Sequence, residues 1–245
     1  LVYAGMENAA APFFQTELYG EPAILEEVVV HEAVHQWWGN DVVPADWPDL
    51  WLAEGPATYL TAELYRRLDG RDAFREALLR MALLDGRSAT RRLVPARLSS
   101  PEDALSATPY QKGGTVLHLL RLTLGDDSFF RALRQTLVAY DDRPLSTAAF
   151  QSELEEASGR DLNAFFQRWV YGTGVPALRT RWDRETGTLS WEVEEGWGLE
   201  GVGAEVLVRQ RGASDQYVSL DDGVASLPGD ARPDVFPVGW LVEVR

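Results

Sequence analysis

The stretch HEAVH, residues 31–35, determines how the rest of this 245-residue sequence is interpreted. His31 and His35 are four residues apart, so on a helix their imidazoles project from one face and can reach a single metal ion. Glu32 lies beside that face, where its carboxylate can contact a water molecule at the metal without binding the metal itself. The pattern H-E-x-x-H on a helix is typical of two zinc ligands and a general base.

Catalytic zinc usually has three protein ligands and leaves one coordination position for water. We therefore expect a carboxylate from a second helix, and LWLAEGPATYL at residues 50–60 offers Glu54. Two of the three histidines of the sequence fall in HEAVH, which argues against a chance occurrence. The apolar-periodic run at residues 22–30 predicts that the motif lies on a buried helix. We predict one zinc ion per chain, bound by His31, His35 and Glu54.

Composition limits the possible partners. The chain has 23 basic and 38 acidic residues, a net charge of −15, which argues against binding to nucleic acid or to an anionic membrane surface. Apolar residues make up 45% of the sequence, as in a globular protein of one or two domains. Without cysteine there are no disulfides, which leaves the compartment open, and we expect a cytoplasmic location. No apolar run is long enough to cross a bilayer.

The first part of the chain has mainly helical signals. We expect a strand at residues 1–5 that has no earlier strand to pair with, followed by a loop to residue 20. Asp49 is expected to cap the helix that carries Glu54. Helices are expected at residues 22–38, 50–68, 72–84, 109–124, 126–140, 146–157 and 161–171, with a loop at 86–101.

The hydrophobic period changes after Gly172. Alternating segments joined by Thr186 and Gly187 predict a hairpin, and further alternating segments follow. Strands are expected at residues 177–183, 188–194, 204–210, 215–220 and 239–244. We predict a helical domain at residues 1–175 and a small β domain at residues 176–245.

Two further motifs accompany the candidate zinc site. Residues 4–8 are AGMEN, 18 residues separate HEAVH from Glu54, and residues 110–114 are YQKGG. With these three features in this order, the sequence resembles the aminopeptidase N-like family of zinc metallopeptidases, the gluzincin aminopeptidases, which include the leukotriene hydrolases. The resemblance covers residues 1–175 and extends more weakly through WVYGTGVPAL into the β segment.

The resemblance implies an α+β fold: a thermolysin-like, mainly helical zinc catalytic domain followed by a small β-sandwich domain. It also implies a zinc-dependent aminopeptidase, which hydrolyses the N-terminal residue from peptides with a free N-terminus by zinc-activated water. Two alternatives remain open, a thermolysin-type zinc endopeptidase and an inactive zinc-containing binding module. The first is disfavoured by AGMEN, and the second by the presence of Glu32 and Tyr110.

The family motifs imply roles for individual residues. His31, His35 and Glu54 resemble the zinc ligands, and Glu32 resembles the general base. Tyr110 resembles the phenol that stabilises the oxyanion. The resemblance assigns substrate binding to the AGMEN segment, at Gly5, Met6, Glu7 and Asn8. Glu7 resembles the carboxylate that holds the substrate α-amine, and the backbone near Gly5 resembles the segment that lies along the substrate.

The sequence also departs from the family pattern. Ala53 and Pro56 replace the usual Asn and Phe beside the third ligand, and Leu105 replaces a second tyrosine. We expect Lys112 to serve structure or the local field, and His118 to be a satisfied core histidine. Relatives have an N-terminal β domain and earlier strands, which supply a second amine-binding acid. We therefore expect association with a missing N-terminal segment of the same enzyme.

Overall fold

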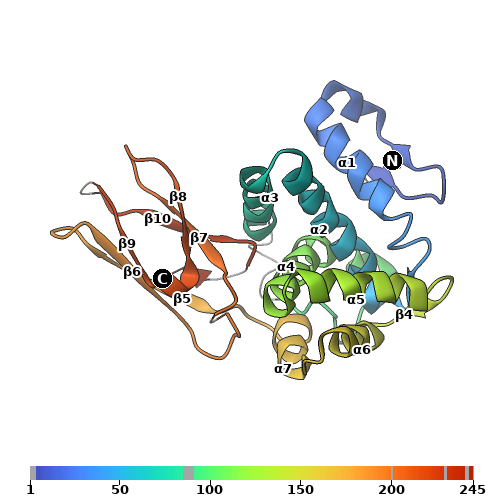
Figure 1. The fold of residues 1–245 in the computed structure, drawn as a ribbon. Helices are drawn as coiled ribbons and strands as arrows, with labels where there is room; N and C mark the ends of the chain where they lie inside the picture. The colour runs from blue at the N-terminus through green and yellow to red at the C-terminus, as the bar shows by residue number, and fades with distance from the viewer. Residues whose placement is uncertain (1–3, 85–90, 200, 229–230, 241–242, 245) are drawn as a thin grey trace.

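A computed structural model describes residues 4–84, 91–199, 201–228, 231–240 and 243–244 of the chain. Helices occupy one side of the molecule, and the strands that begin at Ala177 occupy the other (Figure 1). No helix among these residues has the length and apolar character that crossing a membrane requires. The structure is a mixture of helices and small sheets, in agreement with the predicted α+β class at this level.

Seven α-helices are found in the described part of the chain: α1 Pro22–Val34, α2 Trp51–Leu68, α3 Arg71–Leu84, α4 Gly113–Leu124, α5 Asp126–Ala139, α6 Thr147–Ser158 and α7 Asn163–Phe165. Short 3-10 helices lie at Thr16–Gly20, Trp47–Asp49, Pro101–Ala104 and Leu220–Asp222, and π-helical turns at Thr108–Lys112 and Phe166–Val170. Most expected helices are confirmed, with ends displaced by a few residues. Residues 91–100 are irregular as expected, whereas 85–90 lie outside the described residues.

Two expected features of the helix ends are wrong. The first helix ends at Val34, so His35 follows it as the C-terminal capping residue, still in helical conformation. Asp49 does not cap α2, because its carboxylate accepts hydrogen bonds from the backbone N–H and the hydroxyl of Thr147, at 2.9 and 2.6 Å. Asp49 therefore ties the start of α2 to the start of α6.

The centre of the helical part is the crossing of α2 and α4, both of which are largely buried. Their backbones meet at Gly55 and Gly113. A Cβ atom added to Gly113 would lie 3.0 Å from the Cα of Gly55, and one added to Gly55 would lie 3.1 Å from the carbonyl carbon of Gly113. Only two glycines permit so close an approach. The contact places the segment before Gly113, which contains Tyr110, beside Glu54.

The strands of the C-terminal part form two small sheets. One has the order β10-β7-β8 and the other β11-β5-β6-β9, and buried residues of both sheets belong to one apolar core. The expected hairpin is confirmed, with Asp183 paired to Thr188 and Gly187 at a φ of 64° in the turn. The strands are β5 Ala177–Asp183, β6 Thr188–Val193, β7 Glu205–Arg209, β8 Gln216–Ser219, β9 Val224–Ser226, β10 Asp234–Val238 and β11 Glu243–Val244.

The expected strand at residues 239–244 is confirmed only at its end, where β11 covers Glu243–Val244. Residues 239 and 240 are not in a strand, and β10, which was not expected, ends at Val238. The apolar core continues from the helices into the sheets. At the junction, Arg71 and Arg75 form ion pairs with Glu205, and the Trp240 indole donates to the Glu205 carbonyl at 2.8 Å. The division at residue 175 therefore marks a change of secondary structure within a continuous core.

The N-terminal part lies at the edge of the molecule (Figure 1). β1 Gly5–Met6 pairs antiparallel with β2 Phe13–Phe14, so the strand has a partner downstream, where the sequence predicted only a loop. The start of the strand predicted at residues 1–5 lies outside the described residues. The remaining two short strands, β3 Val43–Pro44 and β4 Pro144–Leu145, pair in parallel.

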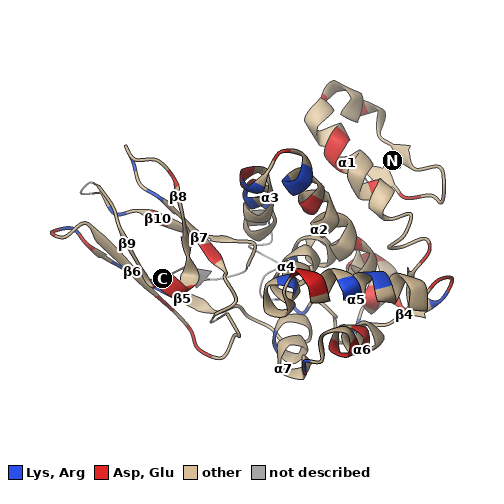
Figure 2. Ribbon diagram, in the orientation of Figure 1, with Lys and Arg blue, Asp and Glu red and all other residues tan. Residues whose placement is uncertain are grey.

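The prediction that α1 is a buried helix is wrong for the described chain. Glu32 is its only buried residue. Ile24 is 51% exposed and Trp37, just beyond the helix, is 57% exposed. Figure 2 shows acidic but no basic residues on α1, in agreement with its sequence. The apolar run at residues 22–30 therefore identified apolar side chains that the described chain leaves largely exposed.

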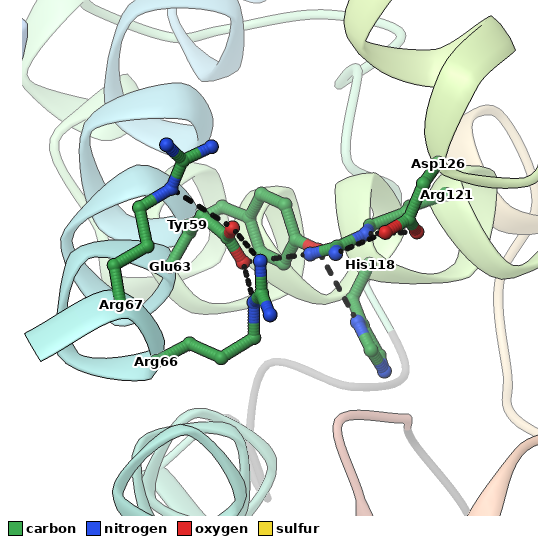
Figure 3. A network of polar contacts seen from close by, with 7 residues as sticks. All are labelled: Tyr59, Glu63, Arg66, Arg67, His118, Arg121 and Asp126. Atoms are coloured by element: carbon green, nitrogen blue, oxygen red, sulfur yellow. Dashed lines mark hydrogen bonds and ion pairs between the residues drawn. The ribbon is translucent and has the colours of Figure 1, made fainter. Parts of the chain in front are cut away.

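A buried polar network joins α2, α4 and α5 (Figure 3). The Arg121 guanidinium donates to Glu63 at 2.7 Å, to the Tyr59 hydroxyl at 3.1 Å and to Asp126 at 2.8 Å. His118 Nδ1 lies 3.4 Å from the Tyr59 oxygen, in agreement with the expected core histidine. Burial, with the positive charge of Arg121, lowers the pKa of His118 to about 3.

We predict that His118 makes the free energy of unfolding depend on pH. The folded protein keeps His118 neutral, whereas the unfolded chain binds a proton below about pH 6.5. Stability is therefore lost as the pH falls below that value, by roughly 2 kcal/mol between pH 6.5 and 5. Urea unfolding at several pH values measures this dependence. The free energy of unfolding should decrease less steeply with falling pH for His118→Gln than for the parent. An equal pH dependence in the two proteins would contradict the prediction.

The glycine contact predicts a second stability effect. A methyl group at position 113 would press on the backbone of Gly55, which cannot rotate away. We expect Gly113→Ala to lower the free energy of unfolding by about 1–2 kcal/mol, despite the higher helix propensity of alanine. Gly20→Ala is the matched control, since a Cβ there meets no atom within 4 Å. The two variants should differ in their denaturant midpoints, and identical midpoints would contradict the prediction.

Candidate metal centre and catalytic site

The structure brings together the three residues predicted to bind metal. His31 lies in the last turn of α1, His35 directly follows that helix, and Glu54 lies in the first turn of α2. The Nε2 atoms of the two histidines are 3.1 Å apart. Glu54 Oε2 lies 3.3 Å from His31 Nε2 and 3.1 Å from His35 Nε2.

This geometry fits a zinc ion. Tetrahedral zinc with bonds of about 2.0–2.1 Å separates its ligand atoms by about 3.3–3.4 Å, close to the distances in the site. His35 Nδ1 lies 2.9 Å from the Trp38 carbonyl, to which it can donate, leaving the Nε2 lone pair for the metal. His35 and Glu54 are buried and His31 is partly exposed, so the group has one accessible side.

The three side chains also change one another's protonation. Burial alone raises the pKa of Glu54, but hydrogen bonds from His31 and His35 outweigh it and lower that pKa to about 2. Burial lowers the pKa of His35, and the hydrogen bond and charge of Glu54 outweigh this and raise it to about 9. Without metal, His35 and Glu54 form an ion pair. A metal ion must displace the His35 proton, so metal affinity rises with pH.

Glu32 lies against the N-terminal hairpin. A Cβ atom added to Gly5 would lie 2.1 Å from Glu32 Oε1, so the carboxylate fills the space that a side chain at position 5 would need. Burial raises the pKa of Glu32, although the nearby charges of His31 and His35 oppose the shift. A carboxylate with a raised pKa next to a metal site is suited to accept a proton.

Tyr110 lies beside the metal ligands, in the π-helical turn Thr108–Lys112. Its ring stacks on the His31 ring with centroids 5.9 Å apart and planes at 17°. Burial and the charge of Glu54 raise the pKa of the Tyr110 phenol, which therefore remains a hydrogen-bond donor at neutral pH. Lys112 is buried, and its ammonium group donates to the Arg91 carbonyl, as expected for a residue with a structural role.

These side chains surround a cavity of about 660 Å³. Gly5, Met6 and Glu7 form part of its lining, whereas Asn8 is exposed and does not line it. Leu105, which stands where some relatives have a second tyrosine, also faces the cavity.

Two positioning residues were missed by sequence reasoning. The carbonyl of Glu7 accepts hydrogen bonds from Asn40 Nδ2 at 2.6 Å and from Gln36 Nε2 at 3.3 Å. Gln36 Oε1 also accepts from the Ala10 backbone N–H at 2.7 Å. Their only sequence signal was a polar side chain shortly after HEAVH, which is equally typical of a turn. They fasten the N-terminal hairpin to the end of α1.

The donor set defines the class of the site. A histidine pair in an H-E-x-x-H segment, completed by a carboxylate from a second helix, is the zinc-site pattern of metallopeptidases. Residues 2–169 match the Peptidase family M1 domain. The match covers more than half of the sequence, and the chain belongs to peptidase family M1. The predicted family resemblance is thereby confirmed.

Individual relatives agree with this assignment. A probable aminopeptidase 2 of Sulfurisphaera tokodaii is 29% identical over 191 residues, which are 72% of this chain and 24% of that protein. The M1 zinc metallopeptidase of Deinococcus radiodurans, solved with a Tyr-Ser-Ala substrate, is 29% identical with a TM-score of 0.61, over 71% of this chain and 38% of that one.

Aminopeptidase A of Legionella pneumophila shares the fold over 98% of this chain and 30% of its own, with 21% identity and a TM-score of 0.66. This chain therefore spans well under half of each of these three proteins.

We predict that Gly5→Ala reduces catalysis while leaving metal binding unchanged. The new methyl group would displace the Glu32 carboxylate, the flexible end of its side chain, so folding should be little affected. A displacement of about 1 Å can cost roughly a hundredfold in rate. We expect kcat on a peptide substrate to fall by about tenfold to a hundredfold, with zinc content equal to that of Gly20→Ala. Parent-like kcat would show that position 5 does not constrain Glu32.

Proposed function

We propose that this chain is part of a zinc-dependent aminopeptidase that removes the N-terminal residue from peptides. The observation that carries the proposal is that the Nε2 atoms of His31 and His35 and Oε2 of Glu54 lie within 3.3 Å of one another. Glu32 and Tyr110 flank this group, and the chain belongs to a peptidase family with relatives named as aminopeptidases.

In the proposed mechanism, His31, His35 and Glu54 hold one zinc ion. When bound there, zinc supplies a Lewis acid that polarises the substrate carbonyl and acidifies water. Glu32 accepts a proton from the attacking water, because it lines the same cavity as the metal ligands and its raised pKa makes it an adequate base. Tyr110 donates a hydrogen bond to the oxyanion that develops on the substrate.

Glu7 confers the aminopeptidase specificity in this proposal. It lines the cavity, and its backbone is fixed by Gln36 and Asn40. Its carboxylate attracts the substrate ammonium group and allows only one residue between the amine and the scissile bond. Gly5 and Met6 line the same end of the cavity and lie along the substrate.

The proposal includes a partner segment. This chain spans only 24% and 38% of two of its relatives. The metal-binding helix exposes apolar side chains at Ile24 and Val29, as do Trp37 just after it and Phe13 in the hairpin. We propose that an N-terminal segment of the same enzyme covers these side chains and completes the cleft.

The finer architecture belongs to the same proposal. Residues 1–175 form the larger part of a thermolysin-like catalytic domain, and residues 176–245 form a β-sandwich domain. The proposed substrates are peptides with a free N-terminus, and the proposed location is cytoplasmic.

The phenol of Tyr110 provides the sharpest test. Tyr110→Phe removes one hydrogen bond that exists only along the reaction path, so kcat should fall by roughly a hundredfold to a thousandfold, with a smaller change in KM. The assay uses an aminoacyl-peptide substrate and the protein together with any natural upstream segment. Zinc content, measured by elemental analysis, should stay at one ion per chain.

Two controls separate the alternatives. His35→Ala should lose zinc, and equal zinc in parent and variant would overturn the metal assignment. N-acetylated peptides should be poor substrates for the parent. Efficient cleavage of an acetylated peptide would favour a thermolysin-type endopeptidase, and zinc binding without hydrolysis would favour a binding module.

A further inference from the structure

A second cavity, of about 460 Å³, adjoins the cavity that contains the candidate catalytic residues. Trp47 and Leu50 line both cavities, so the two meet at these side chains. The rest of the second cavity is formed mainly by the segment at residues 91–109, directly before Tyr110. Residues 4–7 do not line it, so the second cavity adjoins the site away from the proposed amine anchor.

The second cavity is basic in a chain with a net charge of −15. Arg91, Arg92 and Arg97 line it, and all three are exposed. Within the part of the chain that the structure describes, their guanidinium groups form no ion pair or hydrogen bond. Asp103 is the one acidic lining residue so described, and its carboxylate accepts hydrogen bonds from two backbone N–H groups, at 3.1 and 3.0 Å.

The arginine-bearing segment is held in place by the helical core. The backbone N–H groups of Leu93 and Val94 both donate to the Val170 carbonyl, at 2.9 and 3.2 Å, and Leu93 is buried. The buried ammonium group of Lys112 donates to the Arg91 carbonyl. Because Lys112 is two residues from Tyr110, this bond fixes the arginine segment relative to the catalytic turn. A preorganised site loses less entropy when it binds a ligand.

The proposed reaction gives the peptide a direction. With its amine at Glu7 and its first peptide bond at the metal ligands, the rest of the peptide lies beyond the metal ligands. Trp47 and Leu50 line the same cavity as those ligands, and the second cavity begins at these two side chains. An extended peptide advances by about 3.3–3.6 Å per residue, so the groups that enter this cavity lie within a few residues of the scissile bond.

We propose that Arg91, Arg92 and Arg97 bind a carboxylate on the C-terminal side of the scissile bond and make the enzyme selective for short or acidic peptides. The proposal rests on the proposed aminopeptidase function. Guanidinium groups bind carboxylates through paired, charge-assisted hydrogen bonds. The carboxylate can be the peptide C-terminus or an acidic side chain, and the chemistry is the same for both.

The test compares the parent with a variant in which all three arginines are changed to glutamine, Arg91→Gln, Arg92→Gln and Arg97→Gln. Arg211→Gln, on an exposed residue of the β part, is the charge control. The substrates are Ala-Ala-Ala, its C-terminal amide, Ala-Ala-Glu amide and alanine p-nitroanilide. The anilide has no carboxylate and reports the proposed function alone.

The parent should cleave Ala-Ala-Ala about tenfold or more faster, in kcat/KM, than its amide. The triple variant should lose this preference while keeping parent-like activity on the anilide, and Arg211→Gln should keep both. A high rate on Ala-Ala-Glu amide identifies an acidic side chain as a second source of the carboxylate. The preference should weaken at high salt. Equal rates on acid and amide in the parent would overturn the inference.

A binding measurement tests the arginine cavity independently of the proposed aminopeptidase function. If the parent, assayed together with its natural upstream segment, does not cleave the anilide, the proposed function fails, and calorimetry then tests the arginine cavity without turnover. The metal-loaded Glu32→Gln protein should bind Ala-Ala-Ala about tenfold more tightly than the amide, and adding the three arginine substitutions should abolish the difference. Equal affinity for acid and amide would overturn the inference whatever the outcome of the activity assay.

Discussion

The backbone contact between Gly55 and Gly113 is the constraint on which the site depends. Glu54 directly precedes one glycine, and Tyr110 lies three residues before the other. With side chains at either glycine, α2 and α4 would separate, and the carboxylate and the phenol would move apart. Gly114 makes a similarly close contact with α3, where a Cβ atom would lie 2.7 Å from Met81 Sδ. The glycines of AEGP and YQKGG are therefore packing residues that bring two motifs together.

Paired charges support the half of the site that contains Glu54 and Tyr110. Arg121 links α2, α4 and α5 through Glu63, Tyr59 and Asp126 (Figure 3), and a network of this kind is stable only when its members stay paired. The other half of the site has less support, because α1 buries only Glu32 among its own residues. Glu54 lies on the buried helix α2 and Tyr110 in the turn before α4, whereas the histidines and the base lie on the exposed α1 and directly after it.

Sequence reasoning predicted the candidate metal ligands and the helices better than it predicted burial and long-range contacts. The four-residue spacing of His31 and His35 directly predicts a shared helix face, and helix periodicity located most helices to within a few residues. Burial was not predictable in the same way, since an apolar helix such as α1 indicates a surface to be covered and not what covers it. Long-range contacts were also beyond the sequence. Asp49 was expected to cap a helix and instead binds Thr147, and Gln36, which was expected only to continue a helix, holds the Glu7 carbonyl.

The ligand set itself connects the two halves of the site. His31 and His35 come from the exposed helix, and Glu54 comes from the buried one, so any ion that binds all three joins α1 to the core. In the metal-free site, the His35–Glu54 ion pair makes the same connection through a proton, as the opposite shifts of the two pKa values indicate. The hairpin depends in turn on α1, because Gln36 and Asn40 hold Glu7 and the Glu32 carboxylate fills the space at Gly5. The order of dependence runs from the glycine crossing to Glu54, from Glu54 to the histidines of α1, and from α1 to the segment that we propose binds the substrate amine. A change at the crossing should therefore reach residues with which it has no direct contact.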